Sequence, residues 1–178
     1  MRSYHRQEIK EIISRVTLLQ LEAEKLPDVI ENVPWSKAPP DSSSILDQLQ
    51  SLSEFQNSRV IPFLRKITTL SGTPDLKFSE YLNTDKESDS SEIQILLRTI
   101  ADTRKHIVQF LTNLPDRVWG TAALDGKDRL TLMEMARLIE EQDRITLGKI
   151  GDTVMTWQKD FIAQRSIEKK KPSRPNNN

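Results

Sequence analysis

Apolar residues recur at steps of three and four in four separate stretches of the chain, a spacing that gathers them on one side of an α-helix. The stretches cover residues 3–26, 44–67, 91–114 and 131–150. No stretch shows a convincing alternation of apolar and polar residues, the mark of a half-buried β-strand. The pattern therefore predicts an all-α fold built mainly from four helices.

Prolines and polar runs separate these helices. Pro27 is expected to end the first helix, and Pro62 is expected to kink the second. Residues 27–43 are rich in proline and serine, and residues 71–90 form a long polar connection. Because such a connection can cross the full length of a helical bundle, the second and third helices need not be antiparallel neighbours.

Two helix starts carry capping residues. Thr131 and Glu134 have the spacing of a capping box, in which the two side chains satisfy free backbone N–H groups. Ser44 is an N-cap candidate with Asp47 three residues later. We therefore expect one helix to begin after Ser44 and another after Thr131.

The apolar side of the fourth helix includes polar residues. At about 100° per residue, one stripe is expected to contain Leu132, Met135, Leu138, Ile139, Gln142, Ile145, Thr146 and Ile150. Asp143 is expected to lie mostly outside this stripe. Gln142 and Thr146 stand four residues apart, which brings both side chains to one spot on the helix, and we expect both to face inward.

The run QDRIT at residues 142–146, with RLTLMEMARLIEE before it and LGKI after it, resembles the last core helix of the DinB-like superfamily. In that family a His-Asp-x-x-His run supplies two of three metal-binding histidines. The aspartate matches at Asp143. Gln142 and Thr146, however, stand where the family has its histidines.

Two further segments carry the resemblance, which extends over residues 4–157. Residues 44–52, SILDQLQSL, are similar to the helix that supplies the third histidine, and the matching position is Ser51. Residues 113–120, NLPDRVWG, resemble a Leu-Pro-x-x-x-Trp turn of the family. The resemblance implies a four-helix bundle with up-down-down-up connectivity and a long crossover between its second and third helices.

The same resemblance bears on the metal site. Family members with all three histidines bind a divalent metal such as zinc or nickel, and some transfer low-molecular-weight thiols onto substrates. Ser51, Gln142 and Thr146 offer only neutral oxygens and an amide, which bind zinc or nickel far more weakly than imidazole does. We therefore expect no metal or other cofactor, and identify these three residues as vestigial metal-site positions.

Two functions remain open. The preferred one is a non-catalytic DinB-like protein with a degenerate metal site, which binds a small ligand or a protein partner in the residual cleft or acts as a dimeric scaffold. The alternative is a DinB-family transferase whose rebuilt site uses Asp47, Glu54 or Asp143 as cleft residues, with zinc or nickel as a candidate metal. In a purely structural alternative, the two polar residues of the fourth helix hydrogen-bond each other, Ser51 or the backbone inside the bundle. No residue is identified as catalytic.

Composition narrows the partners and the location. The chain has 26 basic and 26 acidic residues, so no overall positive field attracts nucleic acid or an anionic membrane. It has no cysteine, which excludes disulfides and a thiolate nucleophile of its own. No window approaches the ~20 apolar residues that span a bilayer. We expect a cytoplasmic protein with neither a membrane nor a nucleic-acid partner, and the resemblance adds homodimerisation as a hypothesis.

The 178 residues fit one domain, expected over residues 1–165 and followed by a disordered basic tail at residues 166–178. Trp35, Trp119 and Trp157 are expected to close loops onto the core, with a pocket or a dimer face as the alternative. His5 and His106 fall outside the apolar stripes and are expected at the surface.

Overall fold

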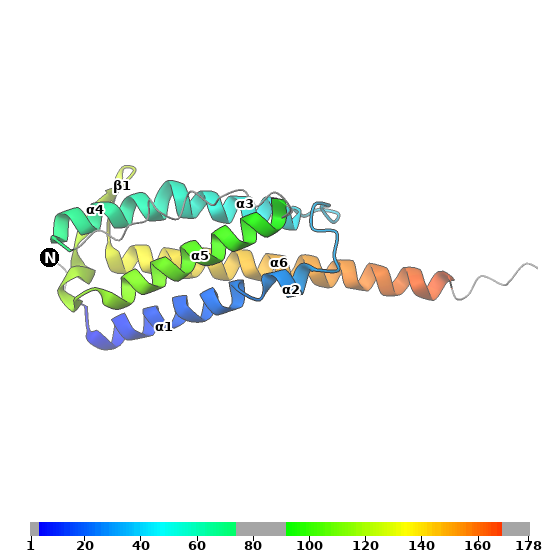
Figure 1. Ribbon diagram of the computed structural model, residues 1–178, viewed down its shortest axis with the longest axis horizontal. Helices are drawn as coiled ribbons and strands as arrows, with labels where there is room; N and C mark the ends of the chain where they lie inside the picture. Colours follow the sequence, from blue (N-terminus) through cyan, green and yellow to red (C-terminus); the bar gives the residue numbers. More distant parts are fainter. Residues whose placement is uncertain (1–3, 74–91, 169–178) are drawn as a thin grey trace, which may run out of the picture.

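The computed structural model describes residues 4–73 and 92–168, with side chains placed through residue 162, and most of these residues are helical (Figure 1). In chain order the elements are α1 (Arg6–Ala23), α2 (Leu26–Ile30), α3 (Ile45–Phe55), the π-helical turn η1 (Gln56–Val60), α4 (Ile61–Ser71), α5 (Glu92–Asn113), the 3₁₀-helix η3 (Asp116–Gly120), β1 (Ala122–Asp125), β2 (Asp128–Thr131) and α6 (Leu132–Glu168). The predicted all-α class is confirmed.

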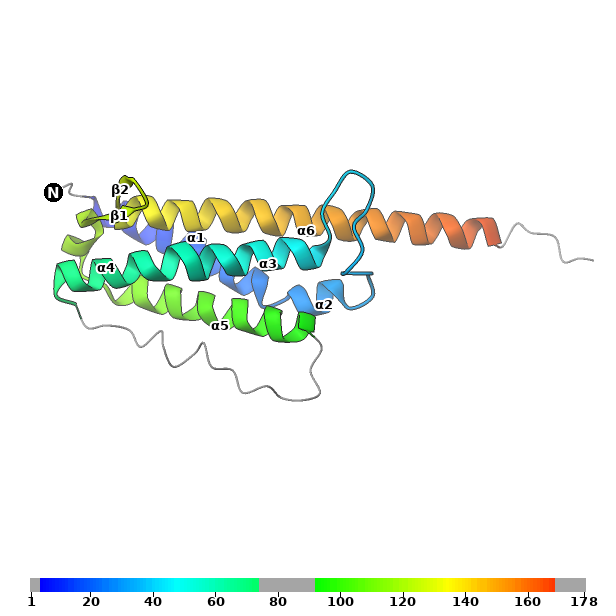
Figure 2. The same cartoon turned by 90° about the horizontal axis from the view of Figure 1, so that it is seen from above.

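The long helices pack side by side. α1 contacts α5 and α6, and α3 contacts the same two helices. Figures 1 and 2 show that α1 and α6 run in one direction along the molecule, while α3, α4 and α5 run in the other. α4 therefore ends at the opposite end of the molecule from the start of α5, and residues 74–90 of the predicted polar connection lie outside the described residues.

Two apolar clusters form the core, one toward each end of the helices. The cluster beside the hairpin draws on α1, α4, α5, η3 and the first turns of α6, and its largest fully buried side chains are Phe63, Trp119, Leu64, Ile67, Ile107, Leu111 and Leu132. The second cluster draws on α1, α2, α3, α5 and the middle of α6, and contains Ala23, Leu26, Ile30, Ile45, Leu49, Leu52, Ile93, Leu97, Ile100, Ile150 and Val154. The apolar residues that recur at helical spacing in the predicted second helix are all buried, namely Ile45, Leu49, Leu52, Val60, Phe63 and Ile67.

Two prolines that were expected to end or kink a helix instead lie in the first turn of one. α1 ends at Ala23, and Pro27 lies in the first turn of α2 instead of ending the first helix. The first turn of a helix tolerates proline because its N–H groups have no partner within the helix. Pro62 also opens a helix, α4, and the expected kink takes the form of the π turn η1, where the N–H of Ile61 donates to the carbonyl of Gln56.

Both predicted caps are confirmed. The backbone N–H of Asp47 donates to Ser44 Oγ at 3.1 Å, and that of Ser44 donates to Asp47 Oδ2 at 3.1 Å. Thr131 and Glu134 form the equivalent pair, in which Glu134 Oε2 accepts from the Thr131 N–H at 2.7 Å. These bonds satisfy backbone donors at the starts of α3 and α6, so local chemistry fixes both boundaries.

The hairpin of β1 and β2 was not predicted. Its two strands pair antiparallel, with Leu124 opposite Arg129 and Asp125 opposite Asp128. Gly126 is the first of the two loop residues and has a φ of +61°, in the left-handed region that two-residue hairpin loops use. The Asp-Gly pair at residues 125–126 is the sequence signal for this turn.

α6 extends well beyond residue 150, as the apolar residues Val154, Trp157 and Phe161 at helical spacing predict. It continues without a break past Gly151 to Glu168, and its C-terminal part extends beyond the other helices (Figure 1). Residues 166–168 are thus helical, although the tail was predicted to begin at residue 166. The rest of the predicted tail, residues 169–178, lies outside the described residues.

Candidate functional site

The three vestigial metal-site positions have different environments. Ser51 is exposed on α3, Gln142 is half-buried on α6, and Thr146 is buried with 5% of its surface exposed. Gln142 Nε2 donates to Thr146 Oγ1 across 3.5 Å, a long hydrogen bond of the kind that the purely structural alternative predicts. The predicted inward orientation is confirmed for Thr146 and only in part for Gln142, which is half-buried.

The other candidate cleft residues do not form one cluster. Asp47 and Glu54 are exposed on α3. The carboxylate of Asp47 is occupied in the helix cap, where it accepts from both the N–H and the hydroxyl of Ser44. A cleft lined by Asp47, Glu54 and Asp143 is therefore not what the fold builds, because Asp143 is buried.

Asp143 is the main correction on α6. It was expected outside the apolar stripe, yet only 3% of its surface is exposed, whereas the predicted inward residue Ile145 is 39% exposed. The observed inward face follows Ile139, Asp143, Thr146 and Ile150, at steps of four, three and four. The face is rotated relative to the predicted stripe because α6 packs against α1 and α3, and its buried carboxylate bonds to α5.

The partner of Asp143 is Arg104 on α5. Arg104 Nη2 donates to Asp143 Oδ1 in a buried ion pair, and 1% of the Arg104 side chain is exposed. Sequence analysis did not identify Arg104 as a site residue. Its spacing was the available signal, since Ile100, Arg104, Ile107 and Leu111 stand at helical steps and the other three are core residues.

Buried polar residues form a layer between the two apolar clusters. On each helix they fall between the residues of one cluster and those of the other, and they are Gln20 on α1, Gln56 in η1, Thr103 and Arg104 on α5, and Asp143 and Thr146 on α6. Within the described residues, Arg104 Nη1 and Gln56 Nε2 have no hydrogen-bond partner. Such donors are costly to bury, so this polar layer is a conspicuous departure from an apolar core.

Burial dominates the electrostatics of the pair. It raises the pKa of Asp143 to about 6 and lowers the pKa of Arg104, because removal from water disfavours each charged form. The attraction between the two charges opposes both shifts. Within the layer the two charges depend on each other, and neither is available to a ligand without breaking the pair.

The pKa of Asp143 predicts a pH effect on stability. Between the ordinary value of 3.8 and about 6, the folded protein retains a proton on Asp143 that the unfolded chain has released. Stability should therefore fall as pH rises through this window, by at most about 1.4 kcal/mol per pH unit.

The measurement is urea unfolding of the wild type and of Asp143→Asn at several pH values. We expect the difference in unfolding free energy, wild type minus variant, to decrease between about pH 4 and pH 6.5, while contributions of other carboxylates cancel. A difference that increases over this range would mean that the attraction to Arg104 outweighs burial.

The residues at the family's metal positions do not fit a zinc or nickel ion. One of the three is exposed, the other two are a neutral amide and a hydroxyl, and the adjacent carboxylate is bound to a guanidinium. Among the described side chains, no group of three or more His, Asp or Glu residues could hold a metal ion. His5 is exposed on one side of the molecule, and His106 is half-buried on another helix.

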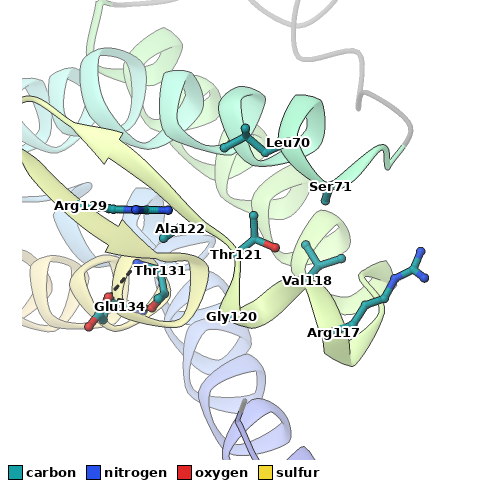
Figure 3. Close-up of a pocket in the computed structure, with 10 residues that line it drawn as sticks. All are labelled: Leu70, Ser71, Arg117, Val118, Gly120, Thr121, Ala122, Arg129, Thr131 and Glu134. Carbon is teal, nitrogen blue, oxygen red and sulfur yellow. Dashed lines mark hydrogen bonds between the residues drawn. The ribbon is translucent and has the colours of Figure 1, made fainter. Parts of the chain in front are cut away.

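A pocket lies elsewhere, at the hairpin end of the molecule (Figure 3). It has a volume of about 740 Å³, in the range of small-molecule sites. α4, η3, the hairpin and the first turn of α6 all contribute to it, through Leu70, Ser71, Arg117, Val118, Gly120, Thr121, Ala122, Arg129, Thr131 and Glu134. No residue of this pocket was singled out as a site residue from the sequence, since its walls come from four separate segments.

The three tryptophans differ in how deeply they are buried. Trp119 is fully buried between pocket residues Val118 and Gly120, and Trp35 packs half-buried against the second cluster. Trp157 is half-buried and lines a different pocket, beside α2. The expectation that tryptophan closes loops onto the core is confirmed for Trp35 and Trp119.

Comparison with known proteins gives no relative, because no family model, no curated protein and no solved structure matches this chain. Across residues 4–73 and 92–168, no helix combines the length and apolar character needed to cross a bilayer.

Proposed function

We propose that this chain is a non-catalytic member of the DinB-like superfamily whose metal position has become a structural ion pair, and which binds a small ligand at its hairpin end. The helix directions support the proposed four-helix bundle: α1 and α6 run one way, while α3, its successor α4, and α5 run the other, as in an up-down-down-up arrangement (Figures 1 and 2). The QDRIT run and the LPDRVW turn support the family assignment.

The observation that carries the proposal is the engagement of Asp143 by Arg104 inside the bundle. The guanidinium supplies a fixed positive charge next to the positions that hold a cation in the family. A divalent ion there would have to compete with a buried, hydrogen-bonded arginine and would gain no imidazole ligand. The arrangement favours a structural role for this layer over metal-assisted transfer.

The ligand-binding part of the proposal is supported by the pocket of Figure 3. It is concave, has the volume of a small-molecule site and is bordered by both apolar and charged side chains. The residual cleft expected around Ser51 has less support, since Asp143 faces α5 and Ser51 faces solvent. A protein partner, homodimerisation and a rebuilt transferase site remain hypotheses from the resemblance.

Elemental analysis tests the loss of the metal site. Protein purified without chelator would be equilibrated with zinc, nickel and manganese, desalted and measured. We expect less than about a tenth of an equivalent of each metal, because neutral oxygen and amide donors hold these ions weakly. A Gln142→His, Thr146→His variant measured in parallel provides a positive comparison.

Near one equivalent of metal in the wild type, lost on substitution of Gln142 or Asp143, would overturn the proposal and favour the transferase alternative. Metal that is retained both by a Gln142 variant and by an Asp143 variant would show that the ion binds elsewhere. That result would leave the proposal of a degenerate metal site standing.

A further inference from the structure

The hairpin presents one side to the core and the other to solvent. Successive strand residues point to opposite sides, and the pairing places Leu124 opposite Arg129 and Ala122 opposite Thr131. All four residues line a pocket, whereas Leu130, on the opposite side, packs against the core cluster. The solvent side of the hairpin is therefore a wall of a binding surface.

Two pockets share this wall. The pocket of Figure 3 adjoins a second one of about 690 Å³, because Leu70, Ala122 and Arg129 border both. Arg65, Lys66 and Leu124 belong to the second pocket. We call these two adjoining pockets beside α4 and the hairpin the hairpin groove.

The hairpin groove has a positive charge excess in a chain of zero formal net charge. Among the described residues, its cationic side chains are Arg65, Lys66, Arg117 and Arg129, and its acidic one is Glu134. Glu134 accepts two hydrogen bonds from Thr131 in the helix cap.

Arg129 is the best placed of these cations. Figure 3 shows its side chain lying across the hairpin beside Ala122, with Arg117 farther out at the edge of the pocket. Within the described part of the chain neither arginine forms an ion pair, whereas Lys66 Nζ donates to the Leu124 carbonyl at 2.8 Å. Arg129 thus retains guanidinium donors for a carboxylate or phosphate at the point where the two pockets meet.

The hairpin groove also exposes apolar surface. Leu70 is 62% exposed and Leu124 is 58% exposed, and they border the second pocket together with Ala123. Exposed leucines beside unpaired cations suit a ligand that is apolar at one end and anionic at the other.

We propose that the hairpin groove binds an organic anion with an apolar group, whose carboxylate or phosphate is held by Arg129 and whose apolar part packs against Leu70 and Leu124. This inference rests on the proposed ligand-binding role and adds the chemical class of the ligand. Arg129 and Leu124 are paired across the hairpin, so the anionic and the apolar group of one ligand can be held side by side.

Calorimetric titration with three probes tests this assignment. Octyl phosphate carries both groups, octyl glucoside has the same chain with a neutral head, and inorganic phosphate has the head alone; all are used below micelle-forming concentrations. We expect octyl phosphate to bind most tightly. Arg129→Gln should weaken its binding about tenfold, the loss of a charge-assisted bond, and Leu70→Ser should weaken it as well.

The matched control is Arg144→Gln, an exposed arginine of α6 that lines a different pocket; it should leave binding unchanged. Octyl glucoside binding as tight as octyl phosphate would overturn the anionic class but keep the ligand-binding role. If no probe binds, or if Arg129→Gln and Leu70→Ser both bind octyl phosphate like the wild type, the groove itself is excluded. Metal content, measured separately, tests the other part of the proposed function, which is the loss of the metal site.

Discussion

Replacing Arg104 with methionine should lower the free energy of unfolding at pH 7 by about 3–5 kcal/mol, the usual cost of breaking a buried ion pair. The substitution keeps a long apolar side chain but removes the only charge that compensates Asp143 in the described structure. Asp143 must then either stay charged in a buried site or take up a proton. Urea unfolding of the wild type and the variant, at one pH and one temperature, measures the loss.

Two controls separate the ion pair from general packing effects. Arg59→Met removes a pair with Asp125 in which the arginine side chain is 41% exposed, and should cost under about 1 kcal/mol. The double variant Arg104→Met, Asp143→Leu removes both charges and should recover most of the stability lost in Arg104→Met. If Arg104→Met costs no more than Arg59→Met, the pair is not the structural element that we propose.

The second large effect is expected at Trp119. Trp119→Ala should lower the free energy of unfolding by about 3–5 kcal/mol, because it removes a large core side chain and leaves a cavity. Trp119 is fully buried, packs in the cluster beside the hairpin and lies between Val118 and Gly120, which line the hairpin groove. Thermal or urea unfolding followed by circular dichroism measures the loss.

Trp35→Ala is the matched control, because the same truncation is made at a half-buried site at the other end of the molecule. A smaller loss of about 1–2 kcal/mol is expected there, as less surface returns to water. Under conditions in which both variants stay folded, Trp119→Ala should bind octyl phosphate less tightly than the wild type does. Trp35→Ala should bind it as tightly as the wild type does. Equal stability losses at the two positions would argue against a special role of Trp119 in holding the groove.

The buried polar layer has a role other than stability. An all-apolar replacement of an ion pair is often at least as stable, so stability alone does not account for Arg104 and Asp143. Their bond joins α5 to α6 at a single register, since sliding either helix by one turn would leave both charges without a partner. Specifying the pairing of these helices is a role consistent with a non-catalytic layer.

Local sequence determined much of this fold. Apolar spacing predicted the positions of the long helices, and the caps at Ser44 and Thr131 predicted where two of them begin. These features depend on residues within one or two turns, so neighbours along the chain are enough to specify them. The same holds for the hairpin, whose turn signal at Gly126 is local but was not recognised from the sequence.

Tertiary packing decided which polar residue of α6 faces the core. Gln142 and Thr146 were predicted within the apolar stripe and Asp143 mostly outside it, although neighbouring positions differ by only about 100°. The choice of Asp143 depends on Arg104, which stands 39 positions earlier in the chain and reaches it only after α5 and α6 have packed. Spacing along α6 alone could not reveal that partner.

The hairpin groove depends even more on tertiary structure. Leu70 lies in the last turn of α4, Arg117 belongs to η3, and Arg129 lies on β2, so the groove exists only when α4 meets the distant part of the chain that contains η3 and the hairpin. Composition could state that the charges of the whole chain balance, but not that arginines and exposed leucines gather at one end. The sequence by itself determined the helices and their boundaries through local periodicity and capping, while contacts between distant segments determined the buried ion pair and the groove.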